Sequence, residues 1–330
     1  HFICSECGIT EDVHTRKPRC ICGGLWQLRF TPPPFALERI DRSIWGLLRY
    51  RAFLPLIGEA WRQISLGEGM TPIVRWDDDV LLKMDYFMPT LSFKDRGAVA
   101  LVSHMKAIGV TDVVQDSSGN AGNSVAAYCA RAGIGCEIFV PEGTSQNKID
   151  MIRSHQARVT VVPGSRDHCA EVCRDKVESE GYYYASHVYN PFFYEGTKTY
   201  VYEVYEQLGR IPQTLFVPLG NGTLFLGVIE GLEHLLQSEC IDRMPRIIAV
   251  QSERCDPFAA AVALGVRKPP AVSPRPTLAE GIAIGRPMRG KEILDAIYRY
   301  QIEVSLAPED NILSAQAELA AAGIYCEHTA

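Results

Sequence analysis

Short apolar runs that alternate with single helical stretches are the feature that most constrains the fold of this chain. From about Leu81 onward, each strand-like run is followed by one helical pattern before the next run begins. Such a chain must cross back over the sheet between strands, which makes parallel βαβ units. We therefore predict an α/β fold with helices on both faces of mostly parallel sheets, in two domains or one large α/β unit. The strand-like runs are DVVQ, CEIFVPEG, RVTVVPG, TLFVPLGNGT and RIIAVQSE.

Length and charge place the chain among cytoplasmic enzymes. Its 330 residues are enough for two domains, and a hydrophobic content of 47% supports a sizeable core. The net charge of −6 gives no field that would gather nucleic acid, and no apolar run is long enough to predict a membrane span. Seven of the eleven cysteines lie scattered in apolar surroundings and are predicted to be buried thiols of an intracellular protein.

The remaining four cysteines form two closely spaced pairs at the head of the chain. Cys4 and Cys7 are separated by two residues, and Cys20 and Cys22 by one. Zinc takes four thiolates in a tetrahedron, and a tight turn at each pair would bring two sulfurs together. The short second spacing weakens the match, so a degenerate knuckle that binds nothing is the alternative. We predict a zinc-ribbon-like head at residues 1–30.

Two polar, glycine-containing loops follow predicted strands and open predicted helices. One is Ser117-Ser118-Gly119-Asn120, and the other is Gly220-Asn221-Gly222-Thr223. Free backbone amides and the helix dipole make such a place suitable for an anion. Either loop alone is weak evidence, because glycine and asparagine also merely form turns. The histidines with no metal-binding spacing, predicted to be structural or surface residues, are His155, His168, His187 and His234.

Lys94 lies between an aromatic residue and an Asp-Arg-Gly turn in the segment PTLSFKDRG. A surface lysine would form an ion pair here, whereas a lysine kept for its amine can bind a carbonyl carbon covalently. Lys148 and Lys198 are rival lysines near other polar motifs. Asp95 and Arg96 are expected to anchor the turn after Lys94 rather than to take part in chemistry.

Seven motifs occur in a fixed order along nearly the whole chain: GEGMTP (67–72), PTLSFKDRG (89–97), SSGNAGNSVAAY (117–128), FVPEG (139–143), NPFFYEGTKT (190–199), VPLGNGT (217–223) and TLAEGIAIGRP (277–287). Together they resemble the threonine synthase branch of the fold type II pyridoxal-phosphate (PLP) enzymes, which also include serine and threonine dehydratases and cysteine synthase. The resemblance implies pyridoxal 5′-phosphate as cofactor and an amino acid as substrate. The cysteine-rich head also occurs in threonine synthases.

The resemblance implies roles for the residues that match its motifs. Lys94 would form the Schiff base with the cofactor and act as general base on the substrate Cα. Phe93 would lie beside the cofactor, with a core aromatic as the alternative, and Asn120 would hydrogen-bond the cofactor ring hydroxyl. The residues that would receive the substrate carboxylate are Ser117, Ser118 and Gly119. The residues that would cradle the cofactor phosphate are Gly220, Asn221, Gly222 and Thr223.

Two positions depart from the family pattern. Where the family reads PTGSFKDRG, this chain has Leu91, which would narrow the pocket or change the turn. Where threonine synthases read NPYR, with an arginine that helps to hold the phosphate of O-phosphohomoserine, this chain has Phe193. A phenylalanine cannot bind a dianion, so either another cation takes over or the substrate carries no phosphate. The nearby cations are Arg153, Arg158 and Lys198.

The resemblance also implies an activity and a fold of two doubly wound α/β domains with mostly parallel sheets. Residues 31–85 and 195–330 would form the large PLP-binding domain, continuing past Ala330 to the residue that faces the pyridine nitrogen. Residues 86–194 would form a smaller, mobile substrate-side domain. The leading hypothesis is a homodimeric lyase like threonine synthase, which converts O-phosphohomoserine to threonine and phosphate in amino-acid biosynthesis. One alternative is β-elimination or β-replacement on a serine-, threonine- or cysteine-like amino acid; another is a non-catalytic PLP-binding regulatory protein.

Overall fold

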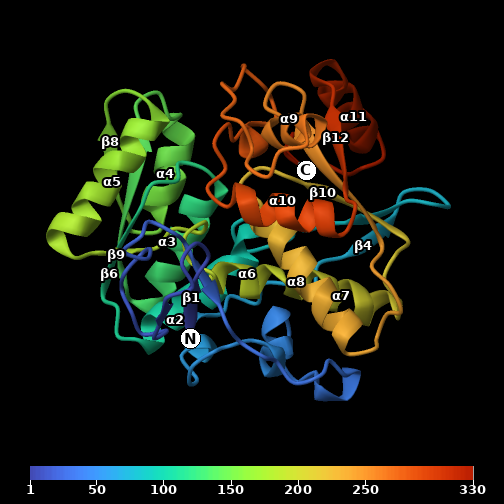
Figure 1. Cartoon of the computed structure of the whole chain (residues 1–330), viewed down its shortest axis with the longest axis horizontal. Helices are drawn as coiled ribbons and strands as arrows, with labels where there is room; N and C mark the ends of the chain where they lie inside the picture. The colour runs from blue at the N-terminus through green and yellow to red at the C-terminus, as the bar shows by residue number, and fades with distance from the viewer. Residues whose placement is uncertain (330) are drawn as a thin grey trace. The chain divides into compact units, whose positions relative to one another are not determined.

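The computed structural model describes residues 1–329, and the chain forms two compact units, His1–Thr199 and a second unit that begins at Tyr200 (Figure 1). Each unit is described by itself below. The predicted division into a large domain and a mobile small domain stays a prediction. Among the described residues, no helix combines the length and apolarity needed to cross a bilayer.

A four-stranded parallel sheet organises the first unit, with the strands in the order β8-β7-β6-β9 (Figure 1). The chain runs outward from β6 through β7 to β8, and then returns to the other side of β6 as β9. This reversal makes a topological switch point between β6 and β9, where ligands bind in open α/β sheets. The strands are β6 (Asp112–Gln115), β7 (Gly135–Pro141), β8 (Arg158–Val162) and β9 (Tyr183–Tyr184). The helices between them are α3 (Asn120–Ala132), α4 (Gln146–Ser154) and α5 (Arg166–Glu180).

The central strands are buried on both faces, which explains their continuous apolar sequences. Val114, Ile138 and Val140 are fully enclosed, as expected for a parallel sheet covered by helices. Helix α3 ends where Gly133 takes a left-handed conformation at φ +66°, which glycine adopts without a Cβ clash. The strands and the helix predicted in this region are confirmed to within a residue or two.

Helices α2 (Lys94–Ala107) and α6 (Phe192–Thr197) cross in close backbone contact within the first unit. A Cβ added at Gly97 would lie 2.2 Å from Cδ1 of Phe193, and one at Gly196 would lie 1.9 Å from the carbonyl oxygen of Arg96. Both positions therefore exclude any side chain larger than hydrogen. Helix α7 (Thr199–Leu208) follows α6.

The N-terminal part of the first unit consists of short elements. An antiparallel sheet in the order β2-β1-β3 forms the head, and β4 and β5 form an antiparallel hairpin. Two 3₁₀ helices and a one-turn α-helix lie between the head and this hairpin. The elements are β1 (Phe2–Cys4), β2 (Thr10–Glu11), β3 (Trp26–Leu28), η1 (Leu37–Arg39), η2 (Leu47–Phe53), α1 (Trp61–Ile64), β4 (Ile73–Arg75) and β5 (Leu81–Lys83).

The second unit contains a parallel sheet in the order β10-β11-β12. Ile247, Ile248 and Ala249 of the central strand are buried. With this second parallel sheet, the predicted α/β fold class is confirmed. The strands are β10 (Thr214–Pro218), β11 (Arg246–Ser252) and β12 (Glu303–Ala307). The helices are α8 (Thr223–Gln237), α9 (Pro257–Leu264), η3 (Glu280–Ile282), α10 (Gly290–Arg299) and α11 (Glu309–Ala321).

Candidate active site

Lys94 is the first residue of α2 and is half-buried. Its backbone N–H lies 3.3 Å from Oγ of Ser92, and its Nζ lies 4.0 Å from the centroid of the Phe93 ring. The rival lysines lie in different surroundings. Lys148 is exposed on α4, and Lys198 is buried in an ion pair with Glu195. The amine of Lys198 also faces an aromatic ring, 5.4 Å from the centroid of Phe30, but it lies against the carboxylate of Glu195. Of the three lysines, Lys94 is the one that is itself the first residue of an α-helix.

The two charged residues after Lys94 hold the turn, as the sequence indicated. The carboxylate of Asp95 accepts hydrogen bonds from the backbone N–H of Thr90 at 2.7 Å and from Oγ of Ser124 at 2.5 Å, which ties α2 to α3. Burial raises the pKa of Asp95, although these donors oppose the rise. Arg96 donates from Nε and Nη2 to Asp85, at 2.8 Å and 2.6 Å. Charge-assisted bonds of this kind fix the start of the helix that carries Lys94.

Leu91 shows why the related motif has glycine at this position. Its φ is +62°, in the left-handed region that side chains other than glycine rarely adopt. The turn is kept, because the Leu91 N–H still donates to the carbonyl of Met88 at 3.0 Å. The side chain is 70% exposed. A leucine here therefore leaves the turn intact and strained, and presents an apolar side chain three residues before Lys94.

The predicted carboxylate-binding loop lies at the carboxyl end of β6, on the side of the switch point. Gly119 is the N-cap of α3, and as a glycine it has no side chain that could cap this helix end. A Cβ at Gly122 would lie 1.8 Å from the carbonyl oxygen of Ser117, so the loop folds tightly over the first turn. Ser117 is buried, whereas Ser118 and Asn120 are half-buried. The loop thus offers backbone amides and hydroxyls at a helix N-terminus, which suits an anion.

The predicted phosphate loop lies in the second unit, between β10 and α8. Gly222 is the N-cap of α8 at φ +79°, and Thr223 is the first residue of the helix. Like Gly119, Gly222 has no side chain that could cap its helix. A Cβ at Gly220 would lie 2.9 Å from Cα of Ile282, and one at Gly222 would lie 2.3 Å from Cδ1 of Ile293. The glycines therefore allow this close packing and leave the uncapped amides to a ligand.

Phe193 is a core residue. It is completely buried, and its ring lies against Gly97 and 5.7 Å from the ring of His187. An arginine in the same place would bring its charge into an apolar cluster. Three nearby cations were candidates to replace the family arginine, and each of them forms an ion pair. The pairs are Arg153 with Asp150, Arg158 with Glu137, and Lys198 with Glu195.

The four cysteines of the head gather at one point. One sulfur from each of Cys4, Cys7, Cys20 and Cys22 lies within 4.8 Å of all the others. The sulfurs of Cys4 and Cys22 are 3.4 Å apart, and those of Cys7 and Cys20 are 3.6 Å apart. A disulfide would need about 2.05 Å, whereas tetrahedral zinc with Zn–S bonds of about 2.3 Å separates its sulfurs by about 3.8 Å. The short second spacing is therefore compatible with a four-thiolate metal site.

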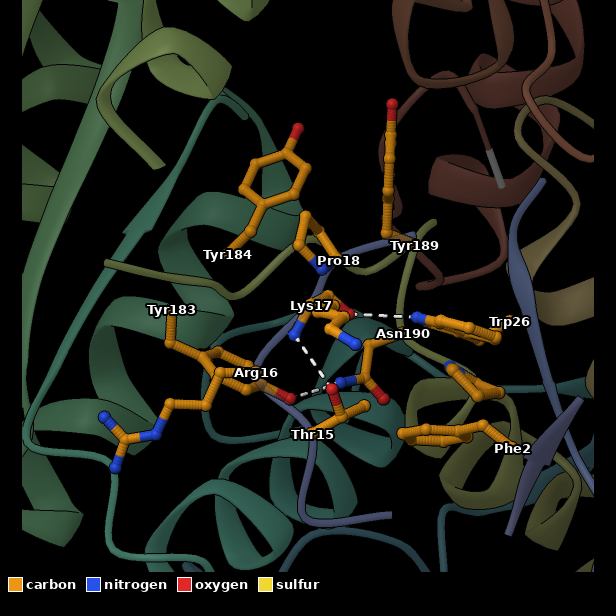
Figure 2. Close-up of a pocket in the computed structure, with 11 residues that line it drawn as sticks. Phe2, Thr15, Arg16, Lys17, Pro18, Trp26, Tyr183, Tyr184, Tyr189 and Asn190 are labelled. Carbon is orange, nitrogen blue, oxygen red and sulfur yellow. Dashed lines mark hydrogen bonds between the residues drawn. The ribbon is translucent and has the colours of Figure 1, made fainter. Parts of the chain in front are cut away.

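The head packs on the segment that follows β9. Figure 2 shows that a small pocket is lined by Arg16, Lys17 and Trp26 of the head and by Tyr183, Tyr189 and Asn190. Nε1 of Trp26 donates to the carbonyl of Lys17 at 2.9 Å, and Nδ2 of Asn190 lies 2.6 Å from Oη of Tyr183. One of these hydrogen bonds fixes the head side of the pocket and the other fixes the opposite side. The head therefore packs against an ordered segment between β9 and α6.

These features define a class of protein: two parallel α/β sheets, a lysine at a helix-start turn and two uncapped helix N-termini that follow strands. The family model described as pyridoxal-phosphate dependent enzyme matches residues 64–330. The chain belongs to this family, in its fold type II branch.

Particular relatives are threonine synthases. The chain is 30% identical to the threonine synthase of Methanocaldococcus jannaschii over 98% of this chain and 83% of that protein. It is 32% identical to the threonine synthase of Mycobacterium leprae over 84% of this chain and 77% of that protein. Among solved structures, it resembles a tomato (Solanum lycopersicum) threonine deaminase isoform with a TM-score of 0.72 and 20% identity, covering 91% of this chain and 83% of that one. This structural likeness concerns the fold.

Proposed function

We propose that this chain is a PLP-dependent carbon–oxygen lyase of the threonine synthase type, with Lys94 as its central residue. The observation that carries the proposal is the Lys94 turn: a half-buried lysine beside an aromatic ring, at the start of a helix whose first turn Asp95 and Arg96 fix. Relatedness to threonine synthases over nearly the whole chain supports the reaction type. A turn that holds Lys94 in a fixed position at the start of a helix argues against a regulatory protein that only binds the cofactor.

Bound pyridoxal phosphate supplies an aldehyde that condenses with amines and a ring that takes up electron density. Lys94 would hold it through Nζ and, once released, remove the proton from the substrate Cα. Ser117, Ser118 and Gly119 would hold the substrate carboxylate, and Asn120 the ring hydroxyl. The backbone amides of residues 220–223 would hold the phosphate. For O-phosphohomoserine the net reaction adds water and releases inorganic phosphate.

A second candidate acts at Cβ of a serine-, threonine- or cysteine-like amino acid, by elimination or replacement. The burial of Phe193 favours it, because the threonine synthase arginine for the substrate phosphate has no counterpart at that position. The acidic partners of Arg153, Arg158 and Lys198 weaken the alternative cations in the first unit. A substrate panel of O-phosphohomoserine, O-phosphoserine, serine and threonine, with phosphate and keto-acid products measured separately, distinguishes the two.

Borohydride trapping tests the role of Lys94. Reduction should fix the cofactor on the peptide that contains Lys94, and Lys94→Ala should abolish both the label and turnover. Lys148→Ala is the matched control, because Lys148 is an exposed lysine of the same unit. Equal labelling of Lys94→Ala and wild type would overturn the assignment.

A structural zinc ion in the cysteine head, a homodimeric state and a cytoplasmic location complete the proposal. The geometry of the four sulfurs supports the zinc ion. The fold family supports the amino-acid substrate and the cofactor. Residues 86–194 as a mobile substrate-side domain stay a prediction that domain-motion measurements with and without substrate would test.

A further inference from the structure

Asp116 is an acidic residue that directly precedes the loop proposed to bind the substrate carboxylate. The loop residues Ser117, Ser118 and Gly119 offer hydroxyls and backbone amides to an anion, whereas a negative charge beside them would repel it. Asp116 is half-buried, so water screens its charge only in part. The place where this side chain is held therefore affects how well the loop can bind an anion.

The hydroxyl of Tyr184 donates a hydrogen bond to Oδ1 of Asp116 at 2.6 Å. Strand β6 ends one residue before Asp116, and among the described residues this is the only hydrogen bond that residues 116–118 make. A hydroxyl that donates to a carboxylate forms a charge-assisted bond, about twice as strong as a bond between neutral groups. The Tyr184 hydroxyl thus anchors the stretch that leads from β6 into the loop.

The ring of Tyr184 is itself fixed on the face of the sheet that α5 covers. It is buried and packs in the cluster that includes Cys169 and Cys173 of α5. The ring of Tyr189 lies edge-on to it, with centroids 5.0 Å apart. The backbone of Tyr184 pairs with Val114 of β6. The hydroxyl is therefore presented from a fixed position.

The hydrogen bond holds the Asp116 carboxylate on this same face of the sheet. After burial, the charge of Asp116 is the next cause that raises the pKa of Cys169, to about 11, which agrees with a carboxylate on the α5 side. The loop continues into α3, whose residue Val125 packs in the cluster of Val113, whereas Val114 belongs to the cluster of α5. Successive strand residues point to opposite faces, so the acidic side chain and the helix that follows the loop lie on opposite faces of the sheet.

We propose that Tyr184 is a positioning residue of the carboxylate-binding loop, whose hydroxyl holds Asp116 on the α5 face so that the substrate carboxylate meets the loop without a negative charge beside it. This inference rests on the function proposed above and deepens it. Tyr184 acts through Asp116 rather than by contact with the substrate. Burial first, and then the charge of Asp116, raise the pKa of Tyr184 well above its ordinary value, so the hydroxyl keeps the proton that it donates.

Tyr183 is the matched control, because it is the neighbouring residue of the same strand. It is buried like Tyr184, and its hydroxyl accepts a hydrogen bond from Nδ2 of Asn190 at 2.6 Å. It packs in the cluster on the other face of the sheet, and Figure 2 shows the two tyrosine rings directed away from each other. Tyr183→Phe therefore removes a buried hydroxyl from β9 and leaves Asp116 held.

The first test is a titration of isotope-labelled holoenzyme, followed by NMR, with glycine and with methylamine. Glycine has no side chain to eliminate, and methylamine is glycine without its carboxylate. Tyr184→Phe should weaken glycine binding by about 10-fold, the change that a lost hydrogen bond to a charged group produces, and methylamine binding by less than about 2-fold. Tyr183→Phe should leave the ratio of the two dissociation constants unchanged. A loss of folded protein affects both ligands equally, so this ratio reports on the loop.

The second test replaces the carboxylate. Asp116→Asn keeps an oxygen that accepts from Tyr184 and removes the charge, so it should bind glycine at least as tightly as wild type. In the Asp116→Asn background, Tyr184→Phe should cost less than about 3-fold in glycine affinity, because no carboxylate remains to turn toward the loop. A full 10-fold loss in that background would show that the tyrosine does not act through Asp116, and would overturn the proposal.

The outcomes separate this inference from the proposed function. A wild-type ratio of the two dissociation constants in Tyr184→Phe would overturn the positioning role while the lyase stands. A protein that converts none of the panel substrates, yet loses glycine affinity in Tyr184→Phe and not in Tyr183→Phe, would keep the positioning role and refute the lyase. A protein that binds neither pyridoxal phosphate nor glycine would refute both.

Discussion

Replacing Phe193 by arginine is the substitution for which sequence and structure make opposite predictions. On sequence alone, Phe193→Arg restores a family residue and should recover part of the affinity for O-phosphohomoserine. In the structure the side chain is completely buried, in the apolar cluster that also contains Val99 and Tyr128, with its ring against Gly97. We therefore expect the substitution to destabilise the protein instead.

The magnitude follows from two losses. Removing a buried phenylalanine from a core costs about 3–5 kcal/mol. An unpaired charge left in the interior is destabilising by a similar amount, about 3–5 kcal/mol, unless the guanidinium reaches water. Each loss alone is a large part of a typical stability of about 5–15 kcal/mol. Phe193→Arg should therefore lose most of its soluble, folded protein.

The yield of soluble protein and the midpoint of urea unfolding, monitored by far-ultraviolet circular dichroism, measure this loss of stability. Phe87→Arg is the matched control, because Phe87 lies in the same unit and is 56% exposed. It should change stability by less than about 0.5 kcal/mol. A Phe193→Arg protein with a wild-type unfolding midpoint and a lowered KM for O-phosphohomoserine would show that position 193 faces the substrate, and our reasoning from burial would be refuted.

Three further predictions concern the turn, its ion pair and the head. Leu91→Gly should raise stability by about 0.5–1 kcal/mol, because a left-handed backbone costs a leucine about 1–2 kcal/mol and the flexibility of glycine takes back part of the gain. Gln156→Gly, also at φ +62°, should raise the melting temperature by a similar amount. A less stable Leu91→Gly would contradict the strain argument. Asp85→Asn should lower the free energy of unfolding by about 3–5 kcal/mol, because it leaves the guanidinium of Arg96 buried without its carboxylate, and an unchanged urea midpoint would argue against that. Protein purified without chelator should contain one zinc ion per chain, and Cys22→Ser should lower both the zinc content and the melting temperature. A folded, metal-free protein in which all four thiols react would contradict the zinc prediction and would indicate a degenerate knuckle that binds no metal.

Local patterns in the sequence were enough to predict the α/β class and the candidate lysine. The apolar run at 112–115 and the helix after it were found because their periods depend on near neighbours in the chain. The anchoring role of Asp95 and Arg96 was also correct, because a turn at a helix start uses residues close in sequence.

Tertiary structure decided the positions that depend on distant segments. Strand β9 has two residues and carries almost no periodic signal, so its pairing with β6 comes from packing across the sheet. The burial of Phe193 likewise depends on the close crossing of α2 and α6, which the glycines at 97 and 196 permit. A one-dimensional pattern records the period of a segment and its end signals. It does not record which segment lies beside it, and that neighbour determines whether a phenylalanine packs in a core or faces a ligand.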